Sequence, residues 1–203
     1  MIYCFIVLET RGIITPDMFE SLEERVREKI CFASFSSCTS NLPAITCAAS
    51  LAHRGLLGSV KDMGTRDVDL TSVPAEHLAS LASNMTGRVF IENVRGFGLV
   101  TILDSVNCER LVLSCQSLSS EETQALVRAM ESSVERVQLQ AKVSLDIQGF
   151  MGYGGQGKCR RVECYSETAD RYKEQLRTWT VSRNWAVTWD GFSFTIDRIL
   201  PFN

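Results

Sequence analysis

Two stretches of the chain share one spacing of apolar side chains. Residues 60–70 read Val60-Lys-Asp-Met-Gly-Thr-Arg-Asp-Val-Asp-Leu70, and residues 108–118 read Cys108-Glu-Arg-Leu-Val-Leu-Ser-Cys-Gln-Ser-Leu118. Near the middle of each stretch, two residues that can be buried stand two positions apart. This is the spacing of side chains on one face of a β-strand. Each stretch therefore predicts a short strand with one buried face.

The same pair of positions recurs through the chain. The recurring pairs are Met63/Thr65, Val89/Ile91, Leu111/Leu113, Val137/Leu139, Val162/Cys164 and Val187/Trp189. Helical spacing is found between most of them, at 74–83, 99–106, 120–133, 146–153 and 168–182, and Ser119 with Glu122 predicts a capping box for the third helix. A strand and a helix alternating about every 25 residues predict stacked units, with parallel strands on one side and helices on the other.

The two stretches resemble the repeat of leucine-rich-repeat proteins, L-x-x-L-x-L-x-x-N/C-x-L, in its longer, helix-bearing, ribonuclease-inhibitor-like form. Residues 47–83 are similar to repeats in the sensor region of animal nucleotide-binding, leucine-rich-repeat receptors. The resemblance covers roughly residues 42–190. Val68 and Gln116 stand where the family repeat has Asn or Cys, and the units at 89 and 137 depart from it after the strand, so the array is irregular. The resemblance implies an α/β fold, a short leucine-rich-repeat solenoid with a curved parallel sheet inside and helices outside.

The N-terminal part reads as a separate segment. Residues 16–33 carry an apolar stripe at helical spacing, residues 34–41 form a polar linker, and residues 42–53 predict another helix. We therefore divide the chain into a strand-and-helix segment, 1–41, and the solenoid with its C-terminal cap, 42–203. The first segment fits either a helical N-terminal cap or a truncated remnant, and the sequence leaves both open.

The C-terminal end predicts a β-hairpin. Residues 185–190 and 192–199 flank Asp190-Gly191, a strong turn signal. Five aromatic residues gather around it, Trp179, Trp185, Trp189, Phe192 and Phe194. They fit an aromatic binding patch or a hydrophobic end cap. We favour a β-hairpin cap, because the last unit of a solenoid would otherwise expose its apolar side.

Composition excludes several classes of protein. The chain has 203 residues, 21 basic and 24 acidic side chains, a net charge of −3 and 45% hydrophobic residues, which is typical of a folded domain. The small excess of acidic over basic side chains argues against a general nucleic-acid or membrane-surface binder. Residues 2–8 are too short an apolar run for a signal peptide or a membrane span, and they fit either a buried strand or the frayed start of a truncated chain. Eight cysteines without a Cys-x-x-Cys pair, and two histidines, predict reduced thiols in the cytoplasm and no metal site.

One motif resembles a phosphate-binding loop. Residues 152–158 match G-x-x-x-x-G-K, but Cys159 replaces the Ser or Thr that would bind magnesium. A helix-like stretch precedes the loop and a strand-like one follows it, the reverse of the usual order. Neither His53 nor His77 lies near a recognisable nucleophile. We therefore expect no enzyme activity, no catalytic residues and no cofactor.

Residues that flank the buried positions face the other side of the strands and form three columns. The first column is Asp62, Arg88, Arg110, Arg136, Arg161 and Ala186. The second is Gly64, Phe90, Val112, Gln138, Glu163 and Thr188, and the third is Arg66, Glu92, Ser114, Gln140, Tyr165 and Asp190. The first column predicts four arginines about 4.8 Å apart, one on each successive strand.

The columns predict a binding face for a protein partner that carries acidic groups, since arginine forks give directional hydrogen bonds. Its expected residues are Arg88, Phe90, Glu92, Arg110, Val112, Ser114, Arg136, Gln138, Gln140, Arg161, Glu163 and Tyr165. A self-neutralised ladder is the other interpretation, because Glu109 and Glu135 directly precede two of the arginines. Duplication of one ancestral repeat would also produce such a column.

The favoured function is a non-enzymatic protein-recognition module. The resemblance implies the sensing part of an innate-immune receptor, present as a fragment or a stand-alone relative. The alternative is a structural or self-associating scaffold without a dedicated ligand.

Overall fold

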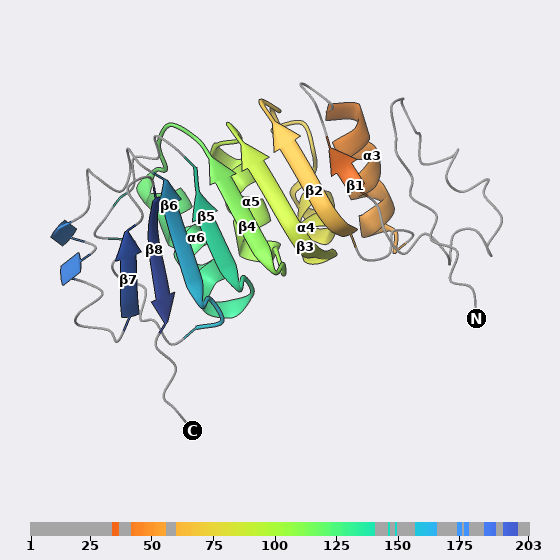
Figure 1. Cartoon of the computed structure of the whole chain (residues 1–203). Coiled ribbons are helices and arrows are strands. Elements are labelled where there is room, and N and C mark those ends of the chain that lie inside the picture. The colour runs from red at the N-terminus through yellow and green to blue at the C-terminus, as the bar shows by residue number, and fades with distance from the viewer. Residues whose placement is uncertain are drawn as a thin grey trace, which may run out of the picture.

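The computed structural model describes residues 34–36, 42–55, 60–140, 146, 149, 157–165, 174–175, 177–178, 185–189 and 193–198. Within these residues the strands are β1 (Ser34–Ser36), β2 (Val60–Arg66), β3 (Met85–Glu92), β4 (Arg110–Ser114), β5 (Arg136–Leu139), β6 (Arg161–Tyr165), β7 (Trp185–Trp189) and β8 (Ser193–Arg198). The helices are α3 (Leu42–His53), α4 (Ala75–Ser83), α5 (Gly96–Ser105) and α6 (Ser120–Ser132). Together they form an α/β fold on one open, mostly parallel sheet (Figure 1).

Consecutive strands lie side by side along most of the sheet. The described strands are ordered β1-β2-β3-β4-β5-β6-β8-β7, and β1 to β6 pair in parallel. The helices lie in a row on one side of the sheet, α3 against α4, α4 against α5 and α5 against α6 (Figure 1). The strand-helix alternation expected from the sequence is confirmed from α3 to β5.

The core lies between the sheet and the helix row. The buried strand residues include the pairs that recur in the sequence: Met63, Thr65, Val89, Ile91, Leu111, Leu113, Val137, Leu139, Val162 and Cys164. The helices bury Leu78 and Leu81, Leu99, Ile102 and Leu103, and Leu126 and Met130 against them. The two-residue spacing of these pairs is what a sheet with one covered face requires, and in β4 and β5 the residues between them, Val112 and Gln138, are buried as well.

Polar contacts also join neighbouring units at about one repeat length. The Asn93 side-chain amide donates to the Asp67 carboxylate at 2.7 Å, just after β3 and β2. Both residues have positive φ, 55° and 50°, a conformation that Asn and Asp tolerate better than most side chains. The Gly96 backbone N–H donates to the Glu122 carboxylate at 2.5 Å. Glu122, at the start of α6, thus binds the first residue of α5.

The helix boundaries agree with the sequence except at α5. The capping box of α6 is confirmed: Ser119 Oγ accepts from the Glu122 backbone N–H at 3.2 Å, and the Glu122 carboxylate accepts from the Ser119 N–H at 2.8 Å. Helix α5 begins at Gly96, three residues before the expected start at Leu99. The reason is long-range, because the acceptor that holds its first N–H is Glu122 in the next unit.

Two expectations about the edges of the sheet are corrected. Residues 34–36, placed in a polar linker, form β1 and pair in parallel with β2. The strand at 187 was expected to follow β6 directly as a further unit. The hairpin pairing of β7 and β8 is confirmed, but β8 lies between β6 and β7 and runs antiparallel to both. The second strand of the hairpin, β8, therefore occupies the position next to β6 that was expected for the first strand, β7.

Several sequence expectations lie outside the described residues. They are the strand at 2–8, the helix at 16–33, the aromatic residues Trp179 and Phe192, and most of the helices expected at 146–153 and 168–182. The division of the chain at residue 42 stays a prediction.

Candidate functional site: the open face of the sheet

The arginine column has the predicted register. Arg88 pairs with Arg110, Arg110 with Arg136, and Arg136 with Arg161 across β3 to β6. The residue that follows each of these arginines is buried in the core beneath the helices, so the arginine column belongs to the opposite face of the sheet. At the β2 end of the column the partner of Arg88 is Asp62, also as predicted.

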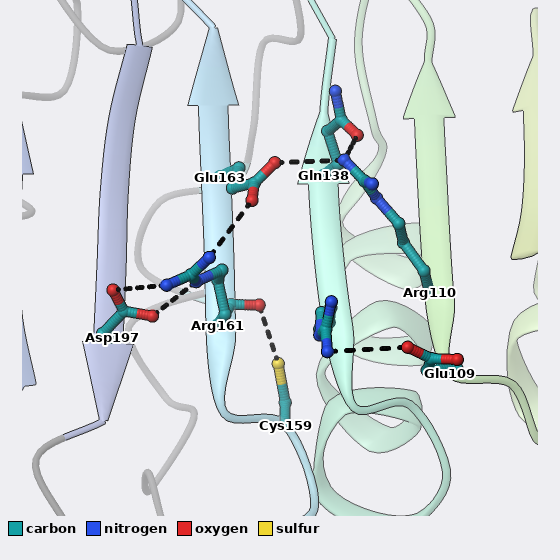
Figure 2. A network of polar contacts seen from close by, with 8 residues as sticks. Glu109, Arg110, Gln138, Cys159, Arg161, Glu163 and Asp197 are labelled. Carbon is teal, nitrogen blue, oxygen red and sulfur yellow. Dashed lines mark hydrogen bonds and ion pairs between the residues drawn. The ribbon is translucent and has the colours of Figure 1, made fainter. Parts of the chain in front are cut away.

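At the other end the column differs from the prediction. The partner of Arg161 is Asp197 on β8. Ala186, expected next to Arg161, lies on β7 and is paired with Asp197 from the other side. The Arg161 guanidinium holds the Asp197 carboxylate through two contacts, Nε to Oδ1 at 2.6 Å and Nη2 to Oδ2 at 3.1 Å (Figure 2). These hydrogen bonds raise the pKa of Arg161 above its ordinary value. Asp197 is a residue of this face that the sequence reasoning missed.

The Arg110 side chain extends from β4 over the adjacent strand β5 as far as β6. Its Nη2 donates to Gln138 Oε1 on β5 and lies 3.3 Å from Glu163 Oε2 on β6 (Figure 2). The other oxygen of Glu163 lies 4.0 Å from Arg161 Nη1. Glu163 is therefore shared by two arginines, and Asp197, Arg161, Glu163, Arg110 and Gln138 form one connected network.

Arg136 stands apart from that network. Its Nη2 contacts Glu109 Oε1 at 3.5 Å, and both side chains are more than half exposed, at 52% and 56%. The sequence reasoning expected Glu109 and Glu135 to neutralise the arginines that they precede. Glu109 instead pairs with the arginine of the next strand, and Glu135 pairs with none of the described arginines. Three arginines of the row thus have carboxylate partners, but not the ones that the sequence led us to expect.

The second column supplies the middle of the face. Phe90, Val112, Gln138 and Glu163 are Cα partners in sequence from β3 to β6. Val112 is 3% exposed and Gln138 is 7% exposed, whereas Phe90 is half-buried. This part of the face is therefore well packed around its centre.

The third column is continuous over fewer strands than expected. Glu92 pairs with Ser114, and both are half-buried. Gln140 follows the end of β5, where its N–H donates to the Leu113 carbonyl at 2.8 Å. Tyr165 pairs with Ser193 on β8, and its side chain lies outside the described residues. The structure thus places Arg88, Arg110, Arg136 and Arg161 on adjacent strands in one row. In the third column, the paired residues run only from Arg66 through Glu92 to Ser114.

The glycine-rich motif has a structural explanation at its C-terminal end. A Cβ on Gly157 would lie 2.3 Å from the Glu131 Cα, so the backbones of the loop and α6 approach too closely for any side chain. Lys158 Nζ donates to the Ser133 carbonyl at 3.0 Å and to Asn107 Oδ1 at 3.1 Å. This lysine binds the C-terminal end of α6, where a cation is favourable. Residues 152–156 lie outside the described part.

Four cysteines are buried as free thiols, namely Cys108, Cys115, Cys159 and Cys164. Burial raises their pKa, to about 12 for Cys108 and Cys164 and to about 11 for Cys115 and Cys159. Thiols in this state are poor nucleophiles and poor metal ligands. The described residues contain no group of three or more side chains suited to a metal ion.

No protein-family model, curated protein or solved structure matches this chain. Among the described helices, none is long and apolar enough to cross a lipid bilayer.

Proposed function

We propose that the chain is a short solenoid of the leucine-rich-repeat type, acting as a non-enzymatic module that binds a protein partner on the open face of its sheet. The observation that carries the proposal is the row of arginines in register on four adjacent strands, on the face away from the helices. Recognition by repeat proteins rests on such extended surfaces, to which each unit contributes a few side chains.

The contacts divide the arginines into two kinds. Arg161 and Arg110 are held by carboxylates inside the network, so their guanidinium groups are already committed to the fold. Arg136 has one long contact to an exposed glutamate, and pairs of this kind contribute little. Its remaining N–H donors can bind a partner without breaking a structural contact. We therefore place Arg136 at the centre of the proposed contact.

The charge balance sets the chemistry of the partner. Arg110, Arg136 and Arg161 are matched by Glu109, Glu163 and Asp197, so this part of the face is close to neutral. A highly acidic partner would meet those three carboxylates as well as the arginines. The fitting partner presents one carboxylate to Arg136 and neutral surface to the packed centre around Val112.

The resemblance of residues 47–83 to receptor sensor repeats supports a sensing role in innate immunity as part of this proposal. The four buried free thiols are consistent with a reducing compartment such as the cytoplasm. The engagement of Lys158 by Asn107 and Ser133 argues against nucleotide binding by the loop, because its ammonium group is not directed at a phosphate.

Affinity capture from cell lysate tests the function. The bait is the full chain, compared with the charge-reversed variants Arg110→Glu and Arg136→Glu. We expect a partner that the unaltered chain retains and the Arg136→Glu variant loses. Capture of copies of the chain alone would favour the self-associating scaffold, and equal capture by folded variants would contradict the proposed face.

A further inference from the structure

Strand β7 (Trp185–Trp189) forms one edge of the sheet. Among the described strands it comes last in the order, and it pairs only with β8 (Figure 1). All five residues of β7 pair with β8 in one continuous antiparallel register. The backbone N–H and C=O groups on the other side of such a strand point away from the sheet and can pair with a further strand. The opposite edge, β1, is only three residues long, and so short a strand offers little to pair with.

The sequence of β7 lacks the features that commonly protect an edge strand. Charged side chains, proline and bulges discourage pairing with a further strand. Trp-Ala-Val-Thr-Trp contains no charged residue and no proline. Each of the six strands that lie between β1 and β7 carries at least one charged residue, so the lack of charge is not general to the sheet. Ala186 and Thr188 are exposed, and their short side chains shield the strand edge less than long ones do.

The residue types of β7 are symmetric about Val187. Tryptophan stands at both ends, and the small residues Ala186 and Thr188 stand on either side of the centre. When two antiparallel copies align at Val187, Trp185 of one copy comes opposite Trp189 of the other, and Ala186 comes opposite Thr188. Aromatic pairs across antiparallel strands are stabilising, and no like charges meet in this register. A second copy of β7 therefore fits the edge of the first.

We propose that two copies of the chain associate through antiparallel pairing of their β7 strands. The interface is isologous, as in most homodimers, because each copy contributes the same strand. The two-fold axis of such a strand pair is perpendicular to the sheet, so the open faces of both copies lie on the same side. The dimer thus presents two arginine rows to that side. The inference does not rest on the proposed function, because β7 contributes none of the residues expected to bind the protein partner.

Analytical ultracentrifugation of the full chain over a range of concentrations tests the interface. We expect a monomer–dimer equilibrium with a dissociation constant of about micromolar order, since one strand pair buries less surface than a standard interface. Thr188→Lys should weaken dimerisation by at least about tenfold, because the two added ammonium groups are diagonal neighbours across the strand pair and repel each other. Thr86→Lys, the same change at an exposed threonine of β3, is the matched control and should dimerise like the unaltered chain.

A charge exchange locates the interface at β7. Thr188→Glu should also lose dimerisation on its own, whereas an equimolar mixture with Thr188→Lys should form a mixed dimer, since opposite charges then lie across the strand pair. Arg136→Glu should dimerise like the unaltered chain, so this inference and the proposed function fail separately. Circular dichroism establishes that each variant is folded. A chain that stays monomeric up to about millimolar concentration, a dimer that persists in folded Thr188→Lys, or the absence of a mixed dimer would overturn the proposal.

Discussion

Arg161 on β6 and Asp197 on β8 form a two-pronged ion pair that joins the parallel part of the sheet to its antiparallel edge. The contacts are 2.6 Å and 3.1 Å, and they connect residues 36 positions apart in the sequence. The pair exists because β8, and not β7, lies against β6. The C-terminal hairpin thus supplies a carboxylate to the arginine row, and this carboxylate holds the Arg161 guanidinium in place.

Replacing Asp197 should therefore weaken the junction between β6 and β8. Asp197→Ala is expected to lower the free energy of unfolding by about 0.5–1 kcal/mol, a small effect because both side chains are more than one-third exposed. Urea unfolding of Asp197→Ala, Arg161→Ala and the double variant gives the coupling energy. A coupling indistinguishable from zero would show that the fork does not stabilise the sheet.

The two glutamates in the first turn of α6 should behave very differently. Glu122 is 5% exposed and binds the N–H groups of Ser119 and Gly96, so Glu122→Ala leaves two donors without their acceptor. We expect a loss of about 2–3 kcal/mol in the free energy of unfolding. Glu121, its exposed neighbour, is the control, and Glu121→Ala should change stability by less than about 0.5 kcal/mol. Similar losses in the two variants would contradict the double cap.

Two glycines are needed for different reasons, and alanine substitution separates them. At Gly157 the new Cβ would collide with the backbone of Glu131, which should cost about 1–3 kcal/mol. At Gly96 nothing lies within 4 Å, so Gly96→Ala meets only the penalty of φ +61°, about 1 kcal/mol. Thermal unfolding should therefore rank Gly157→Ala as the less stable variant. The reverse order would show that the loop does not pack against α6 as described.

Stability should fall as the solution becomes alkaline. In the folded chain the pKa of Cys108 and of Cys164 is about 12, against an ordinary value of 9.0. Above pH 9.0 the unfolded chain loses these protons while the folded chain keeps them, so the free energy of unfolding decreases between pH 9.0 and about 12. The slope is about 1.4 kcal/mol per pH unit for each such thiol.

Urea unfolding at a series of pH values checks this decline. Cys108→Ala is the control, because it removes one of the raised thiols and should make the decline shallower. An unchanged slope in that variant would show that Cys108 does not titrate as its burial requires.

The sequence allowed the strands and the arginine register to be predicted, because both follow from local periodicity. The two-residue spacing of the apolar residues Leu111 and Leu113 predicts a strand, and repeats of near-constant length then bring Arg110 opposite Arg136. The start of α5 could not be predicted in this way. It depends on Glu122, which lies 26 residues further along the chain.

The partners of the arginines were predicted poorly for a physical reason. Glu109 lies just before β4 begins, so strand periodicity does not fix the direction of its side chain, which pairs with Arg136 across the sheet and not with adjacent Arg110. A turn signal shows that β7 and β8 pair with each other, but not which of them reaches β6, and Asp197 was missed for that reason.

The central claim is that the open sheet face binds a protein partner through Arg136. The most direct measurement is the affinity of the purified partner, identified by capture, for the Arg136→Glu chain. Arg128→Glu is the matched control, since Arg128 is equally exposed and paired with Asp104, but on the helix side. We expect the reversal at Arg136 to weaken binding by at least tenfold and the reversal at Arg128 to leave it unchanged. Equal affinities of the unaltered chain and Arg136→Glu, with both folded, would contradict the account.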